Sequence, residues 1–300
     1  MGQQDLSRYF KFWDHFFEAW KYATSQSDPA KGYQDRINGL LSDRSIEPPI
    51  LGFPNTDIYN CSCETTHTFE YIPEPYWGGW NDKSGHDLKM VVVNLNPASG
   101  GKKQHFSSGS GIWGKSSYSD YVIEQVNSYC KATLKGDKGL INQYNTSKWH
   151  NKNRAEKLMH GTCKNDNEYP DPLKHYLGID LVPWHTPKFK SLGMYPSQNI
   201  KSINKWALEF AIDASESIKD NDILKGIVAV RSSLKSFKAI FKDKFECGEF
   251  SEVADSALTV NKESRVIIKI KDRPNSKFCL LSGFKNDLPS KDFLKGVFNP

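Results

Sequence analysis

The chain has 300 residues, of which 38% are hydrophobic and 13% aromatic, so it can bury a sizeable core and is not a disordered protein. It contains neither an apolar run of about 18 residues nor a secretory leader, and we expect neither a membrane protein nor a secreted one. The net charge of +5 is uneven: residues 1–100 hold 8 Lys and Arg against 13 Asp and Glu, whereas residues 101–160 hold 10 against 4.

The N-terminal stretch predicts a helix over residues 5–24. Aromatic side chains recur there at steps of three or four residues, which places them on one face, typical of core or of a docking face. They are Phe10, Trp13, Phe16, Phe17 and Trp20. Residues 45–88 are rich in Pro, Gly, Asn and Thr and predict irregular structure. We therefore expect residues 1–70 to form an N-terminal helical and irregular extension.

From residue 88 onward, apolar runs alternate with helical patterns. Continuous runs rich in β-branched residues predict strands buried on both faces at 88–95, 176–184, 223–230 and 276–283. Strict alternation predicts an edge strand at 264–270, and helical spacing predicts helices at 203–218, 233–241 and 290–298. This order predicts an α/β fold with a central, mostly parallel four-stranded sheet and helices on both faces.

The turns after such strands are where ligands of open α/β sheets bind. The first turn, "NLNPASGG", spans residues 94–101. Pro97 restricts Asn96 to an extended or turn conformation, which fixes a short amide side chain just past the strand end. Asn96 is either a functional group or a residue that only caps the turn, as asparagine often does.

Several stretches together resemble the uracil-DNA glycosylase superfamily, in particular its mismatch-specific and thymine-type branches. They are "PEPYWGGW" (73–80), the strand ending in Asn-Leu-Asn-Pro, "LGIDLVPWHTP", "ILKGIVAVRSS" and "FCLLSGFKNDLPSKDFL", in that order. The resemblance covers residues 71–300, which we expect to form one glycosylase-like α/β domain. It implies a monofunctional DNA N-glycosylase, a hydrolase of N-glycosyl bonds, that excises a base from DNA.

The same resemblance implies roles for the first turn. Asn96 would orient the attacking water, where the uracil-specific branch has an aspartate. That branch also places a tyrosine soon after the motif, against C5 of the pyrimidine. Here small residues follow at 98–101, so a larger C5 substituent would fit, unless this is only a glycine-rich turn.

The second strand delivers Asp180, where uracil-specific relatives use an asparagine to read the base. An ionised carboxylate only accepts hydrogen bonds, and the amino group of cytosine donates them, so Asp180 favours a cytosine-type base. Alternatively, Asp180 caps a helix or pairs with a lysine. The histidine of the family's last loop is absent, which leaves Lys285 or His185 to stabilise the departing base, and Leu288 fits the residue that wedges into the duplex.

The complete set of candidate site residues follows from these turns. The catalytic candidates are Asn96, His185 and Lys285; the base-pocket candidates are Asn94, Leu95, Pro97, Ala98, Ser99, Asp180, Trp184 and Phe284; the DNA-binding candidates are Lys102, Lys103, Arg231, Ser232, Ser233, Asn286, Leu288 and Ser290. Basic residues interleaved with aromatic ones over 101–160 suit a polyanion with stackable bases, although a solvated surface over buried aromatics has the same composition.

We expect no cofactor, no metal, a monomer and a cytoplasmic location with reduced thiols, since a chain of this size needs no disulfides. Cys61 and Cys63 lack the second close pair of a metal site. The favoured function is excision of bulky 5-substituted cytosine from phage DNA as antiviral defence. The alternatives are a uracil or mismatch repair glycosylase and a catalytically silent DNA-binding member. A Rossmann-like nucleotide enzyme would need a Gly-x-Gly-x-x-Gly turn after the first strand, which is missing.

Overall fold

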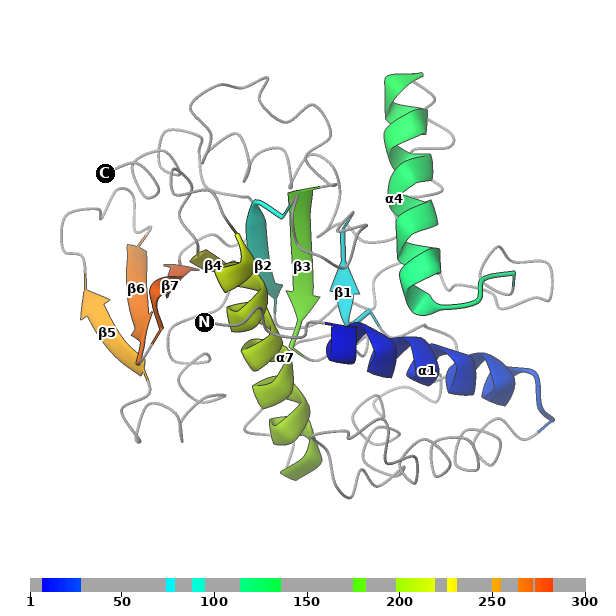
Figure 1. The fold of residues 1–300 in the computed structure, drawn as a ribbon, viewed down its shortest axis with the longest axis horizontal. Helices are drawn as coiled ribbons and strands as arrows, with labels where there is room; N and C mark the ends of the chain where they lie inside the picture. The colour runs from blue at the N-terminus through cyan, green and yellow to red at the C-terminus, as the bar shows by residue number, and fades with distance from the viewer. Residues whose placement is uncertain are drawn as a thin grey trace.

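A computed structural model describes ten segments of the chain, and they form one sheet with three helices. The segments are residues 7–27, 74–78, 88–94, 114–135, 175–181, 198–218, 226–230, 250–254, 264–271 and 273–282. The helices are α1 (Ser7–Thr24), α4 (Tyr118–Leu134) and α7 (Gln198–Ser217), and the strands are β1 (Tyr76–Trp77), β2 (Met90–Asn94), β3 (Tyr176–Asp180), β4 (Gly226–Val230), β5 (Phe250–Ala254), β6 (Ser264–Ile270) and β7 (Arg273–Ser282) (Figure 1). Of the helices in these segments, none is long and apolar enough to cross a bilayer.

The sheet has seven strands in the order β1-β3-β2-β4-β7-β6-β5. Its four central members, β3, β2, β4 and β7, run parallel to one another, and they correspond to the four strands expected from apolar runs. β1 extends one side antiparallel to β3, and β6 and β5 extend the other side in antiparallel pairs. The sheet is therefore wider than the four strands that the apolar runs indicate.

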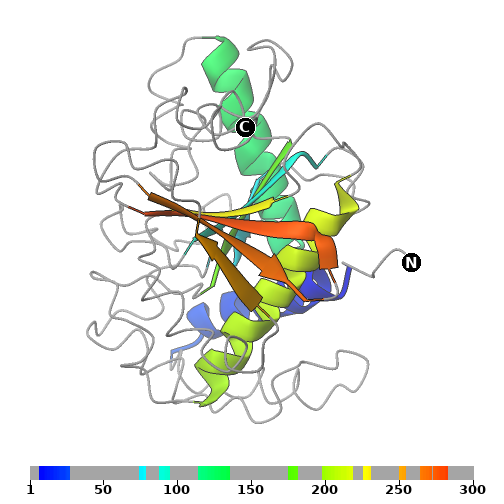
Figure 2. The same cartoon turned by 90° about the vertical axis from the view of Figure 1, so that its left-hand side faces the viewer.

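Strand β2 lies between β3 and β4 in the parallel set, and this inner position accounts for its apolar sequence. Val91, Val92 and Val93 are at most 1% exposed, so both faces of the strand are covered, as a continuous β-branched run predicts. α7 packs against β2, β4, β7 and β3 (Figure 2). Its buried alanines, Ala207, Ala211 and Ala214, recur at steps of four and three and form a narrow face that can approach the sheet closely. Whether helices cover both faces stays a prediction, because the expected helices at 233–241 and 290–298 lie outside the described residues.

The prediction that 264–270 is an edge strand is wrong. β6 lies between β5 and β7, paired from Phe250↔Ile270 to Ala254↔Val266 on one side and from Ser264↔Ser282 to Ile270↔Arg273 on the other. Alternation reports only that the two faces of a strand differ in environment, and it carries no information about lateral neighbours. The strand that takes the outer position, β5, has the mixed sequence "FSEVA", which we did not identify as a strand.

Helix α1 belongs to the same aromatic core as β1, α4 and α7. Tyr9 stacks on Phe210 of α7 with ring centroids 3.9 Å apart, and Phe10 meets Tyr76 of β1 edge-on at 4.8 Å. Phe17 packs on Tyr121 of α4. The predicted aromatic stripe is thus confirmed as core, except for Trp20, whose side chain is outside the described set. The domain boundary at residue 70 falls between described segments and stays a prediction.

Candidate active site

Two parallel strands end side by side at the place where the sequence predicts a site. Asn94, the last residue of β2, is the register partner of Asp180, the last residue of β3. β4 and β7 run in the same direction, with Val93 paired to Ala229 and Val230 paired to Leu281. The turns that follow these four strands therefore begin at one edge of the sheet, here called the carboxyl edge.

The end of β2 is also the point where the connections of the chain change direction. From β2 the chain continues to β3 on one side, and from β3 it continues to β4 on the other side of β2. In open α/β sheets this switch point opens a crevice outside the carboxyl ends, and ligands bind there. The turn at 94–101 starts at this position, which sequence reasoning could not establish without the strand order.

The Pro-Glu-Pro segment meets the carboxyl edge through a backbone bond. The amide N–H of Asp180 donates to the carbonyl oxygen of Pro75 at 3.1 Å, and β1 continues this pairing with Tyr76 opposite Ile179. Three stretches of the resemblance, separated by up to about a hundred residues, are thus adjacent at one place: residues 74–78, the end of β2 and the end of β3.

The Asp180 carboxylate lies in a buried environment that contains two tyrosines. Asp180 is 2% exposed. Burial raises the pKa of Tyr9 of α1 far above its usual value, and the charge of Asp180 raises it further. Burial likewise raises the pKa of Tyr118 of α4, with smaller contributions from Glu74 and from Asp180. Both phenols therefore stay protonated and act as neutral donors. Because Asp180 is buried, its carboxylate can contact only a group that is brought into the interior.

The buried tyrosines predict a loss of stability in alkali. Burial also raises the pKa of Tyr76, and the unfolded value for all three groups is about 10. Because the pKa of each tyrosine is higher in the folded state, the three tyrosines contribute their full stabilisation below about pH 10. Above that pH, the free energy of unfolding should fall by about 1.4 kcal/mol per pH unit for each tyrosine. Urea unfolding at stepwise higher pH measures this slope. Phenolate absorbance that develops fully before the chain unfolds would contradict it.

A hydrogen-bonded chain fixes the start of α4, where the turn region after β2 rejoins the described structure. Both the N–H and the Oγ of Ser119 donate to Oδ1 of Asp14 of α1 at 2.9 Å. The hydroxyl of Tyr76 lies 2.7 Å from the same Oγ and, since Ser119 donates to Asp14, acts as the donor. Asp14 thus satisfies an N-terminal amide of a helix 105 residues away, and its charge is favourable at that helix end.

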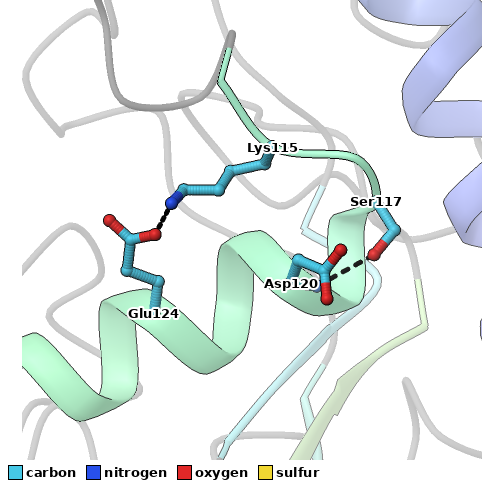
Figure 3. Close-up of polar contacts among 4 residues, drawn as sticks. All are labelled: Lys115, Ser117, Asp120 and Glu124. Carbon is cyan, nitrogen blue, oxygen red and sulfur yellow. Dashed lines mark hydrogen bonds and ion pairs between the residues drawn. The ribbon is translucent and has the colours of Figure 1, made fainter.

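Local contacts also cap α4 (Figure 3). The N–H of Asp120 donates to Oγ of Ser117 at 3.0 Å, which is the usual geometry of an N-cap, and Lys115 forms an ion pair with Glu124. The region between Asn94 and Gly114, which contains Asn96 and the Lys102-Lys103 pair, therefore connects two fixed ends: a central strand and a doubly capped helix.

Of the candidate site residues, the structure describes two. It brings Asn94 and Asp180 together by backbone register, and for Asn94 nothing is described beyond the backbone. The remaining candidates lie outside the described residues: Leu95, Asn96, Pro97, Ala98, Ser99, Lys102, Lys103, Trp184, His185, Arg231, Ser232, Ser233, Phe284, Lys285, Asn286, Leu288 and Ser290.

Sequence reasoning missed three groups at this edge: Tyr9, Tyr118 and Glu74. Glu74 is 3% exposed, and a carboxylate between two prolines gives no sign of such burial. Tyr9 directly precedes Phe10, the first residue of the predicted aromatic stripe. It differs from the residues of the stripe in carrying a hydroxyl group. Within the described segments, no group of three or more His, Cys, Asp and Glu side chains is placed to hold a metal ion.

No protein-family model, no curated protein and no solved structure matches this chain.

Proposed function

We propose that the protein is a monofunctional DNA glycosylase that flips a modified pyrimidine out of DNA and hydrolyses its N-glycosidic bond. The favoured substrate is a bulky 5-substituted cytosine in phage DNA, and the product is an abasic site. The observation that carries the proposal is the pairing of Asn94 with Asp180 at the switch point of the sheet. It supports a site in which the turn bearing Asn96 faces the strand end bearing Asp180.

The chemistry of base removal suits the residues of the first turn. Cleavage of an N-glycosidic bond passes through a dissociative transition state with a cationic sugar, so it needs a positioned water more than a strong base. The side-chain carbonyl of Asn96 can orient that water, and Pro97 limits the conformations of Asn96 in advance. His185 or Lys285 would stabilise the departing base.

The burial of Asp180 supports recognition of a base that has left the duplex. A carboxylate with 2% exposure is out of reach of a base in stacked DNA, whereas a flipped base enters a pocket and is read along its edge. The cytosine amino group donates where a carboxylate accepts. The small side chains at 98–101 leave space for a group on C5.

The deciding experiment compares two DNAs. The protein is incubated separately with uracil-containing DNA and with phage DNA that carries hydroxymethylated or glycosylated cytosine, and the released base is identified by mass spectrometry. We expect release of the modified cytosine, with strand breakage after alkali. Release of uracil alone would replace the defence function with ordinary repair, and release of neither base would leave a catalytically silent DNA-binding protein.

A pair of variants tests the space beside C5. Ala98→Tyr rebuilds the wall that uracil-specific relatives have, and it should abolish release of the 5-substituted base. Ala98→Ser, which keeps a small side chain at the same position, should retain it. Equal activity of the two variants would show that residue 98 does not line the pocket.

A further inference from the structure

One backbone carbonyl joins helix α1 to the end of β3. The carbonyl oxygen of Pro75 accepts the N–H of Asp180 at 3.1 Å, and the hydroxyl of Tyr9 donates to the same oxygen at 3.5 Å. Tyr9 lies in the first turns of α1, which Figure 1 shows beside β1, at the end of the sheet toward which the arrow of β3 points. The N-terminal helix, which lies outside the stretch that resembles glycosylases, therefore contacts the carboxyl edge directly.

We propose that Tyr9 is a positioning residue for Asp180: its hydroxyl, acting through the Pro75 carbonyl, fixes the last residue of β3 and makes α1 part of the base-reading site. The inference rests on the proposed function, because Asp180 is taken to read the base. It assigns a role to a segment for which the sequence indicates none.

The ring and the hydroxyl of Tyr9 have separate explanations. The ring packs in the aromatic core, stacked on Phe210 at an interplanar angle of 5° and 4.8 Å from the ring of Trp206. A phenylalanine would make the same contacts. A buried hydroxyl costs free energy unless it is hydrogen-bonded, so an apolar core alone does not account for it. Its acceptor is the carbonyl oxygen of Pro75, which also accepts the N–H of Asp180.

The protonation state of Tyr9 is consistent with a fixed donor. Burial raises its pKa well above the ordinary value, and the negative charge of Asp180 opposes ionisation as well. The hydroxyl therefore remains a donor at the pH at which an exposed tyrosine ionises. A positioning contact of this kind does not vary with pH near neutrality.

A matched control exists in Tyr76. Its hydroxyl is also buried and hydrogen-bonded, but to Ser119 rather than to the Pro75 carbonyl. Tyr9→Phe and Tyr76→Phe each remove one buried hydroxyl and keep the ring. A purely structural role predicts similar effects of the two variants, whereas positioning predicts an effect at Asp180 in Tyr9→Phe alone.

The first measurement is independent of activity. Amide hydrogen exchange at Asp180, relative to Val92 in the central strand of the same variant, should be about five- to tenfold faster in Tyr9→Phe and unchanged in Tyr76→Phe. Equal ratios in the two variants would overturn the inference, even for a protein that releases no base.

The second measurement uses base release and a double-mutant cycle. With the modified-cytosine DNA, Tyr9→Phe should raise KM about tenfold and change kcat little, since it disturbs base recognition and not the water, and Tyr76→Phe should change neither. Combined with Asp180→Asn, Tyr9→Phe should add almost no further loss, because both changes act on one group. Additive losses would overturn the inference. Failure of the wild-type protein to release any base would instead refute the proposed function.

Discussion

Replacing Asn96 with alanine is expected to lower the rate of base release by about 100-fold or more, because loss of the group that orients a reactant has effects of this size. Asn96 follows the central strand at the switch point, and Pro97 limits its conformations. The sequence predicts a turn at this position, so we expect the fold to remain intact. Single-turnover release of the base measures the rate, and thermal unfolding checks the fold.

Asn96→Asp is the matched variant for this experiment. It keeps the size of the side chain and an oxygen that can orient water, and the uracil-specific branch of the superfamily that the sequence resembles has an aspartate at this position. We expect it to retain base release. If Asn96→Ala kept near-normal turnover, Asn96 would be only a turn residue and the mechanism would be wrong.

Gly78→Ala is expected to destabilise the protein severely, by about 3 kcal/mol or more. Gly78 follows β1 with φ of 133°, a conformation that residues with a Cβ rarely adopt. An added Cβ would collide with the backbone carbonyl oxygen of Tyr176, at the start of β3, and that oxygen cannot move without displacing the strand. The midpoint of urea unfolding measures the loss.

Gly114→Ala provides the comparison. Gly114 is exposed in the turn before α4, and alanine there should change the free energy of unfolding by no more than about 0.5 kcal/mol. If Gly78→Ala unfolded at the same urea concentration as Gly114→Ala, the close approach of residue 78 to β3 would be wrong. Loss of soluble protein for Gly78→Ala alone agrees with the expectation.

The sequence predicted those elements whose burial follows from their own pattern of apolar residues. The valines of β2 are buried on both faces, so they form a continuous apolar run that needs no knowledge of neighbours. β3 is likewise buried along its whole length, and the apolar runs of β4 and β7 also predicted strands. The aromatic spacing of α1 predicted a buried helical face. Asp180 was singled out because uracil-specific members of the family that the sequence resembles use an asparagine near this position to read the base.

Lateral neighbours and long-range contacts were decided only by the tertiary structure. Strand pairing and helix caps join residues far apart in the chain, and no local pattern encodes which distant carbonyl or carboxylate will be the partner. For this reason β6 is an inner strand and not an edge, and β1 and β5 were not expected.

For the same reason Asp14 of α1 was not expected to cap α4. The sequence by itself predicted buried strands at 88–95 and 176–184, which contain Asn94 and Asp180. Only the fold decided that these two residues are neighbours and that Tyr9 and Asp180 share the carbonyl of Pro75, because register and helix docking depend on the whole core.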